Sequence, residues 1–349
     1  MTESDFIPEI DYNIDVDAIY KILSGKTVLI TGAGGSIGSN LVKKVLKYTP
    51  SKLILIDIAE TPLHAISRYV TETGATNLRY LTDIRNKNRL QSIFNETTPD
   101  IVFHVAAYKH VWLTEENPAE AIEVNLLGTK NVCEVAVSSN CEKVVFISTD
   151  KAVNPISVLG ITKQLAEQYV LYQQGIITNT KFSIVRFGNV FNSNGSVIET
   201  FKSQLLAGKP VTLTSKEVER YFLTINAACD LILQCTVLND AHVLYTFDMG
   251  ASIKIESILN KLIDLLGITP VEIIETGLQP GEKLYEELYE KTALIKPTTH
   301  TKIIALYENR NTSNIVAICN HLEEIIAHIH SPQKIKLALI EALTNCSIL

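Results

Sequence analysis

Residues 27–38, TVLITGAGGSIG, decide how this chain folds. The stretch joins an apolar run, 27–31, to glycines spaced GxxGxxG at Gly32, Gly35 and Gly38. An apolar run without alternation is typical of a strand buried on both faces of a parallel sheet. Glycines after such a strand let the backbone turn sharply and approach a pyrophosphate closely. The pattern therefore predicts an α/β fold that binds a dinucleotide.

The residues after the glycines indicate which dinucleotide would bind. A helix that begins near Ser36 and Ile37 would direct its N-terminal amides at the pyrophosphate. A second apolar run, 52–56, ends in Asp57, about 20 residues past the glycines. A carboxylate there can accept both adenosine ribose hydroxyls and repel a phosphate, which favours NAD over NADP. The alternative is a tight turn followed by a solvated aspartate.

Two further strands are expected to bring residues to the same edge of the sheet. A third strand is expected over residues 78–81, and it precedes Asp83 and Ile84. Asp83 could meet the adenine amino group and Ile84 the adenine ring, although Asp83 could equally cap a helix. A fourth strand is expected over residues 101–105, and Ala106 and Ala107 follow it. Their small side chains would let a cofactor lie against the backbone.

Polar residues follow that fourth strand. Tyr108, Lys109 and His110 come at its carboxyl end, where ligands bind in open α/β sheets. For Lys109 we favour a role in the site over an ordinary loop position. A helix is expected over 120–137, and we expect its Asn125, together with Tyr108, to contact the cofactor, although Asn125 could instead be a solvent-exposed polar residue.

A second stretch, residues 148–163 (STDKAVNPISVLGITK), carries groups suited to proton transfer. An apolar run precedes it, so Thr149, Asp150 and Lys151 are expected at the carboxyl end of a buried strand. Lys163 is expected on the helix that follows. A hydroxyl, an acid and two amines in such a set can move protons on a bound substrate. The alternative is a surface turn with an ordinary ion pair.

Composition excludes several classes of protein. The chain has 349 residues, of which 46% are hydrophobic and 20% charged, so it is long enough for a large core and two lobes. A net charge of −7 argues against a nucleic-acid or membrane-surface protein. The six cysteines lack metal-binding spacing, so no metal is expected. The acidic N-terminus resembles no signal peptide, and no apolar run reaches membrane-spanning length, so we expect a cytoplasmic protein.

Several motifs together resemble a known family. TGAGGSIG, HVAAYKHV, VNLLGT around Asn125, STDKAVNP and GITK are similar to those of extended short-chain dehydrogenase/reductases. More narrowly, they resemble the UDP-N-acetylglucosamine 4,6-dehydratases, in the soluble catalytic part that CapD-like relatives carry behind membrane helices. RFGNVFNSNGSVIETF from Arg186, RYFLTI from Arg220 and GLQPGEKLYEEL from Gly277 agree, and the resemblance covers residues 14–304.

The resemblance implies a fold and a division into lobes. The expected fold is a Rossmann-type doubly wound parallel sheet with a smaller α/β substrate-binding lobe. A homo-oligomer, a dimer or larger, is also expected. The expected ranges are an N-terminal arm at 1–20, the NAD-binding domain at 21–190 and 223–252, and the nucleotide-sugar lobe with C-terminal helices at 191–222 and 253–349.

The resemblance also implies a reaction. Such enzymes convert UDP-N-acetylglucosamine to a UDP-2-acetamido-2,6-dideoxy-4-hexulose by moving a hydride from carbon 4 to carbon 6, early in the synthesis of surface glycans. Asp150 would protonate the leaving hydroxyl, and Lys151 would remove the carbon-5 proton. Thr149 would bind near the carbon-4 hydroxyl, and Lys163 the nicotinamide ribose. Burial would keep Asp150 protonated, and nearby positive charge would keep Lys151 neutral.

Contacts to the nucleotide-sugar and two departures complete the comparison. The resemblance assigns Asn189, Arg220 and Glu282 to the substrate, along with the Lys109–His110 pair, although Glu282 could be an ordinary surface carboxylate. Leu159, four residues before Lys163, stands where short-chain dehydrogenases usually place a proton-transferring tyrosine, although part of the dehydratase group has methionine there. We therefore assign the carbon-4 base to Asp150, acting through Thr149 or a water. Gln279 stands where relatives often have arginine.

Two other functions fit parts of this pattern. A nucleotide-sugar 4-epimerase needs a base at carbon 4 but no acid and base at carbons 5 and 6, so the adjacent Asp150 and Lys151 argue against it. A catalytically silent NAD-binding protein would explain Leu159, but the retained acid and amines argue against that function.

Overall fold

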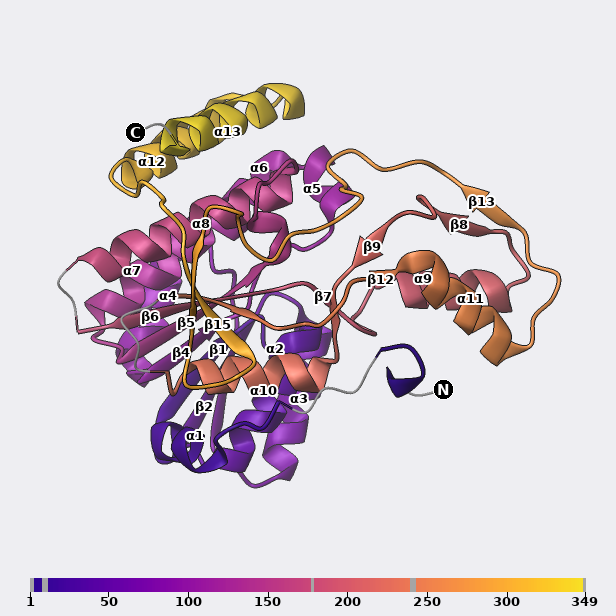
Figure 1. Cartoon of the computed structure of the whole chain (residues 1–349). Coiled ribbons are helices and arrows are strands. Elements are labelled where there is room, and N and C mark those ends of the chain that lie inside the picture. The colour runs from indigo at the N-terminus through magenta and orange to yellow at the C-terminus, as the bar shows by residue number, and fades with distance from the viewer. Residues whose placement is uncertain (1–2, 8–11, 177–178, 239–242, 348–349) are drawn as a thin grey trace.

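The computed structural model of the chain describes residues 3–7, 12–176, 179–238 and 243–347. Figure 1 shows a large lobe built on a twisted sheet and a smaller lobe beside it. The N-terminus lies near the smaller lobe, and the C-terminal helices lie at the far side of the larger lobe (Figure 1).

Nine strands form the main sheet, in the order β14-β15-β11-β6-β5-β4-β1-β2-β3. Neighbouring strands from β3 to β11 are parallel, whereas β15 is antiparallel to both β11 and β14. The strand bounds are β1 (Thr27–Thr31), β2 (Lys52–Asp57), β3 (Asn77–Leu81), β4 (Ile101–His104), β5 (Lys143–Thr149), β6 (Lys181–Phe187), β11 (Leu244–Phe247), β14 (Leu294–Pro297) and β15 (Ile303–Tyr307). The order β3-β2-β1-β4-β5-β6 is the doubly wound arrangement, which confirms the predicted fold class.

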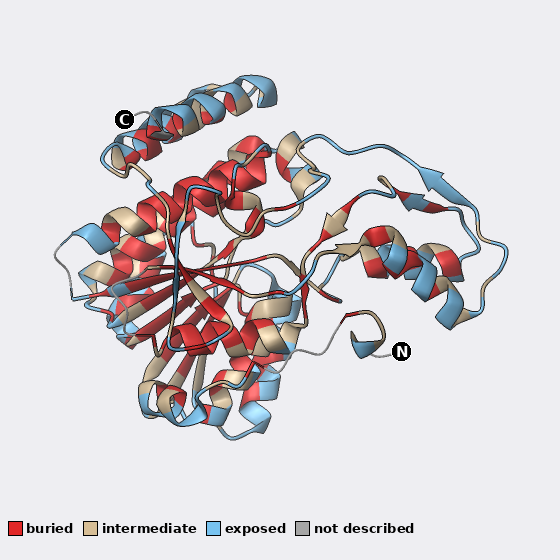
Figure 2. Ribbon diagram, in the orientation of Figure 1, coloured by how far each residue is buried: buried red, intermediate tan, exposed pale blue. Residues whose placement is uncertain are grey.

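Helices cover both faces of this sheet. The inner strands are therefore continuous apolar runs, because both of their faces pack into a core. In β1, Leu29 packs into the core on one face, whereas Val28 and Ile30 pack into the core on the other. Figure 2 shows the central strands of the sheet as buried, whereas the edge strands β3 and β14 contain no buried residue. One face carries α1 (Val16–Leu23), α2 (Ser36–Val45), α3 (Glu60–Glu72) and α10 (Ile225–Cys235), and the other α4 (Lys87–Thr97), α7 (Thr129–Ser138), α8 (Val158–Gly175), α12 (Ile315–His328) and α13 (Pro332–Ser347).

The helix expected over 120–137 is a longer and less regular run. It begins with α6 (Pro118–Ala121), continues through a π-helical segment, η3 (Ile122–Gly128), and ends in α7. π-helical turns inside α-helices often occur at functional sites. Here the segment contains Asn125, whose side chain is completely buried.

The smaller lobe has its own apolar core. Phe201, Val211 and Leu259 are among its most buried residues, and the cluster is separate from the two cores of the sheet. Three short strand pairs and two helices enclose it. They are β7 (Asn189–Val190) with β10 (Phe222–Leu223), β8 (Val211–Leu213) with β13 (Ile273–Glu275), β9 (Glu219–Arg220) with β12 (Ile253–Lys254), α9 (Val197–Leu206) and α11 (Ile255–Leu266).

Two of the expected ranges differ from the structure. Residues 294–349 were assigned to the smaller lobe, but β14 and β15 extend the main sheet, and α12 and α13 pack against α8. The apolar faces of these helices complete the core on that side. The range 1–20 was expected to be a separate arm, but Phe6 contacts Phe191, Ile7 is buried in the core of the smaller lobe, and α1 begins at Val16.

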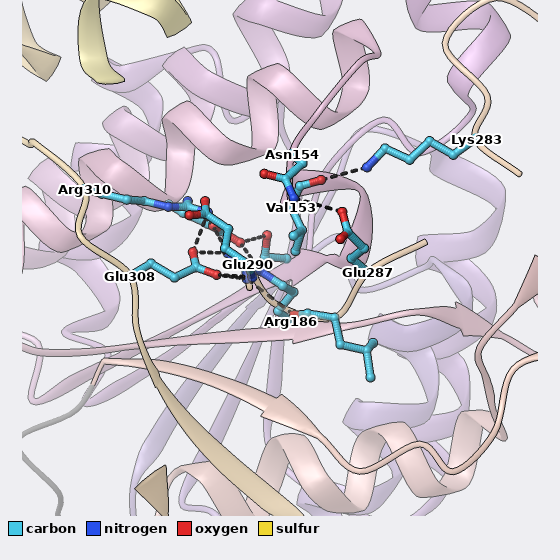
Figure 3. Close-up of polar contacts among 11 residues, drawn as sticks. Val153, Asn154, Arg186, Lys283, Glu287, Glu290, Glu308 and Arg310 are labelled. Carbon is cyan, nitrogen blue, oxygen red and sulfur yellow. Dashed lines mark hydrogen bonds and ion pairs between the residues drawn. The ribbon is translucent and has the colours of Figure 1, made fainter. Parts of the chain in front are cut away.

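Four buried charges join α8, the sheet and the segment after β15. Arg186 on β6 pairs with Glu167 on α8 at 2.6 Å and with Glu308 at 2.8 Å. Arg310 pairs with Glu167 at 2.6 Å and with Glu308 at 2.5 Å (Figure 3). Burial alone would raise the pKa of Glu167, but Arg186 and Arg310 outweigh it and lower the pKa to about 2. Each charge is compensated only while its partners stay in place.

We expect Glu167→Gln to destabilise the protein by about 3–5 kcal/mol, because the two arginines would lose their shared buried carboxylate. The contribution of Glu167 is present above its unfolded pKa of about 4.3 and is lost as the pH falls toward the folded value of about 2. Urea unfolding at neutral pH measures the difference. Glu290→Gln is the control, because Glu290 is partly exposed and 3.4 Å from Arg310, and an equal loss in both variants would contradict the prediction.

Candidate active site

A pocket of about 610 Å³ opens at the carboxyl edge of the sheet, where the strand order reverses between β1 and β4. This is the ligand position expected for open α/β sheets, and the volume suits a cofactor or substrate. Most of the predicted site residues line it. These are Gly32, Gly35, Ser36, Ile37, Gly38, Asp57, Asp83, Ile84, Ala106, Ala107, Tyr108, Lys109, His110, Thr149, Lys151, Lys163 and Asn189. Asn125, Asp150, Arg220 and Glu282 do not line it.

The glycine-rich turn leaves no room for side chains. Gly32 has a φ of +66°, and a Cβ on it would lie 2.8 Å from the backbone nitrogen of Ala106. A Cβ on Gly38 would lie 2.0 Å from the carbonyl oxygen of Gly32. Gly35 precedes the first residue of α2, so the amides of the first turn face the pocket. The turn therefore forms a cradle for a pyrophosphate.

Asp57 lies at the end of β2 and holds this cradle. Its Oδ2 accepts a hydrogen bond from Gly34 N at 2.8 Å, and its Oδ1 accepts one from Ala59 N at 2.9 Å. A carboxylate can accept further bonds on each oxygen. Asp57 therefore stabilises the turn and still presents a negative group at the pocket wall.

Asp83 forms an ion pair with the neighbouring Arg85. Its Oδ2 pairs with Arg85 at 2.6 Å, and Arg85 also pairs with Glu123 at 2.6 Å. Burial opposes the ionised form of Asp83, but the hydrogen bonds from Arg85 outweigh burial and lower its pKa. The helix-cap alternative for Asp83 is wrong, because Asn86 caps α4 through its side chain.

Asn125 acts on the loop rather than on the pocket. Its Oδ1 accepts from Tyr108 N at 2.8 Å, and its Nδ2 donates to Tyr108 O at 3.2 Å and to Thr162 Oγ1 at 3.3 Å. All three contacts are internal, so the side chain is not solvent-exposed, and it does not line the pocket. Asn125 fixes the backbone of the loop that follows β4.

The 193–196 loop of the smaller lobe packs against Lys109, His110 and Ser36. Lys109 Nζ donates to Asn194 O at 2.6 Å, and Asn194 N donates to Ser36 Oγ at 3.0 Å. A Cβ on Gly195 would lie 2.9 Å from the His110 ring. Burial lowers the pKa of Lys109. No separate sequence signal marks this loop beyond its position in the motif that begins at Arg186.

The acid and amine at the end of β5 form an ion pair. Lys151 Nζ is 3.0 Å from Asp150 Oδ1 and 3.2 Å from Asn189 Oδ1. Thr149 Oγ1 donates to the same Asp150 oxygen at 2.9 Å. Asp150 is completely buried, and its Oδ2 has no hydrogen-bond partner. The pair thus holds one bonded and one unbonded carboxylate oxygen.

The expectation of a neutral Lys151 is wrong for this structure. Burial lowers the pKa of Lys151, but the carboxylates of Asp150 and Glu286 outweigh burial and raise it above its ordinary value. Glu286 Oε1 is 3.6 Å from Lys151 Nζ. Sequence reasoning missed Glu286, although it follows Glu282 by four residues in a motif already recognised.

Lys163 lies under the pocket floor on α8. Its Nζ donates to Ile147 O at 2.7 Å and lies 4.0 Å from the centre of the Phe146 ring. Burial lowers the pKa of Lys163 to about 7, with Glu167 partly opposing the change. Leu159, one turn earlier, lines the pocket with an apolar side chain.

Arg220 and Glu282 lie together outside the pocket. Arg220 donates to the carbonyl oxygens of Leu284 at 3.1 Å and Lys283 at 2.8 Å, and it pairs with Glu282 at 3.4 Å. Gln279 N lies 3.2 Å from the same glutamate. These contacts attach the segment before β14 to the smaller lobe, so here Arg220 holds protein backbone.

Together, the doubly wound sheet, the glycine cradle and the lysine on α8 define an extended short-chain dehydrogenase/reductase. The chain belongs to the polysaccharide biosynthesis protein family, whose model matches residues 28–308. Among the described residues, no helix combines the length and apolar character needed to cross a bilayer.

The capsular polysaccharide biosynthesis protein CapD of Staphylococcus aureus is 43% identical over 295 residues, which are 83% of this chain and 49% of CapD. The chain thus spans about half the length of this relative. The structure of Pen from Bacillus thuringiensis is 30% identical, with a TM-score of 0.75, and the match covers 86% of this chain and 99% of Pen.

Two relatives with different named activities are similar to the same extent. The inverting UDP-N-acetylglucosamine 4,6-dehydratase of Campylobacter jejuni is 31% identical, over 76% of this chain and 78% of the relative. A UDP-glucose 4-epimerase of Rickettsia bellii is 32% identical, over 78% of this chain and 80% of the relative. Nucleotide-sugar dehydratases and epimerases therefore both occur among the relatives.

We expect Gly38→Ala to abolish dinucleotide binding, because its Cβ would meet the Gly32 carbonyl at 2.0 Å and force the cradle open. Isothermal titration with NAD measures the loss. Gly175→Ala is the matched control, because nothing lies within 4 Å of its Cβ. Normal NAD binding by the Gly38 variant would mean that this turn does not hold the pyrophosphate.

Proposed function

We propose that this protein is an NAD-dependent UDP-N-acetylglucosamine 4,6-dehydratase. The observation that carries the proposal is that Thr149 and Lys151, at the end of β5, line the pocket that also contains the glycine cradle, while the buried Asp150 contacts both of them. A dehydration needs an acid and a base close together, and these residues supply both.

The cradle fits the dinucleotide that this chemistry needs. The close approach of backbone at the glycines and the amides of α2 match a pyrophosphate. The Asp57 carboxylate matches a ribose with free hydroxyls. When bound, NAD would supply the acceptor for the hydride of sugar carbon 4 and, once reduced, the hydride donor to carbon 6. Lys163 would bind the nicotinamide ribose, and Thr149 would hold the carbon-4 hydroxyl.

Asp150 and Lys151 then serve the carbon-5 and carbon-6 step. Transfer of the shared proton from Lys151 Nζ to Asp150 Oδ1, 3.0 Å away, would give a neutral amine and a carboxylic acid. The amine would take the carbon-5 proton, and the acid would protonate the departing carbon-6 hydroxyl. Because Leu159 has no proton to transfer and Asp150 already receives the proton of Lys151, the carbon-4 proton would pass through Thr149 to a water.

The nucleotide-sugar is dianionic, and the net charge of the chain is −7. Local cations must therefore hold the diphosphate. Lys109 lies beside the 193–196 loop at the pocket wall, and we assign it and His110 to this contact. Asn189 would contact the sugar beside Lys151.

A 4-epimerase is the second candidate, since one relative of equal similarity carries that name. Epimerisation needs a base at carbon 4 only, and the position that often supplies it is Leu159 here. Incubation with NAD and UDP-N-acetylglucosamine, followed by mass spectrometry, separates the candidates. Loss of one water supports the dehydratase, whereas an isomer of unchanged mass supports the epimerase. An unchanged substrate contradicts both.

Asp150→Asn and Lys151→Met should each lower kcat by at least about 100-fold, because one proton carrier is lost. Carbon-4 oxidation does not need Lys151, so the absorbance of the reduced dinucleotide should build up in the Lys151 variant. Stopped-flow absorbance follows this step, and mass spectrometry follows product. Lys151→Met with the parent's turnover would remove this residue from the mechanism.

Asp57→Ala should weaken NAD binding by about tenfold or more, because the acceptor for the ribose hydroxyls would be lost. NADP binding should weaken less, because the repulsion between Asp57 and the 2′-phosphate would be lost as well. Titrating each cofactor into the parent and the variant gives the ratio of dissociation constants. A ratio that stays the same would show that Asp57 does not select the cofactor.

A further inference from the structure

Glu286 is a buried carboxylate that the proposed reaction does not use. Only 7% of the residue is exposed, and its Oε1 is 3.6 Å from Lys151 Nζ. Its Oε2 makes no hydrogen bond and lies 3.8 Å from Lys283 Nζ. Burying a carboxylate is costly unless nearby cations compensate it. Because Glu286 lies next to Lys151, its charge can affect the protonation of that lysine.

Two contacts hold the segment around Glu286 against the loop that follows the reactive pair. Lys283 Nζ donates to Val153 O at 2.8 Å, and Asn154 Nδ2 donates to Glu287 Oε2 at 2.8 Å (Figure 3). One contact precedes Glu286 in the sequence and the other follows it. The carboxylate is therefore held in place by neighbours on both sides.

Charged side chains surround the Asp150–Lys151 pair. Asp150 and Glu286 face Lys151 as anions, and Arg220 faces it as a cation. Glu286 is itself faced by Lys151, Asp150, Arg220 and Lys283. Burial and the charge of Asp150 raise the pKa of Glu286, and the three cations oppose this change. Glu286 thus adds a second negative charge next to a pair that already shares one proton.

We propose that Glu286 is a positioning residue that acts through Lys151, keeping one proton on the Asp150–Lys151 pair. This inference rests on the proposed dehydratase function. With one proton shared, the pair is a carboxylate and an ammonium. When an Nζ–H bond breaks and an Oδ1–H bond forms, the pair becomes a carboxylic acid and an amine. If the proton left for solvent instead, the pair would have a base but no acid for the departing hydroxyl.

Competitive acetylation tests the charge coupling without any turnover. The full-length protein is labelled with trace acetic anhydride across a range of pH, and the peptide with Lys151 is quantified by mass spectrometry. Glu286→Gln should lower the pKa of Lys151 by about one pH unit or more, because a nearby opposite charge is removed. Glu287→Gln is the matched control and should leave it unchanged. An unchanged or higher pKa of Lys151 in Glu286→Gln would overturn the proposal.

Steady-state kinetics with NAD and UDP-N-acetylglucosamine test the consequence for catalysis. In Glu286→Gln, the loss of kcat at alkaline pH should begin about one pH unit or more below that of the parent, with KM nearly unchanged. Glu286→Asp should restore part of the difference. A fall in kcat by the same factor at every pH would indicate a structural role and would sink the proposal. A parent enzyme without dehydratase activity would refute the proposed function, and the acetylation result would still decide the role of Glu286.

Discussion

Helix α8 is held in place by four charges buried between it, the sheet and the segment after β15. Glu167, one turn beyond Lys163, pairs with both Arg186 and Arg310. Ser148, directly before the reactive stretch, donates a hydrogen bond to Glu167 as well. The strand end that leads to Asp150 and the helix that carries Lys163 are thus anchored by the same cluster. A shift of this cluster would move both walls of the pocket together.

A second constraint comes from the segment that leads from the smaller lobe into β14. Arg220 holds its backbone, and Lys283 and Glu287 attach it to the loop after β5. The segment thus connects the two lobes beside the pocket and places a carboxylate next to Lys151. The lobe that would bind the nucleotide-sugar and the groups that would move its protons are therefore mechanically coupled.

Much of the sheet lobe could be predicted, because its signals are local. The run 27–31 and the glycines after it require a buried strand and a tight turn whatever surrounds them. Residues 294–349 were misplaced for the opposite reason. An amphipathic helix such as α12 has an apolar face, but its periodicity does not say which surface that face covers. The π-helical segment around Asn125 was missed because it depends on contacts with Tyr108 and Thr162.

The sequence by itself determined which chemical groups are present and which strand ends carry them. Spacing placed Asp57 and the Asp150–Lys151 pair at one edge of a parallel sheet, because successive strands in such a sheet end on the same side. Only the tertiary structure decided the electrostatics of that edge. Glu286 lies 135 residues from Lys151 along the chain, but 3.6 Å from it in space. Charge acts through distance in three dimensions, so the protonation state of Lys151 could not be read from its neighbours in sequence.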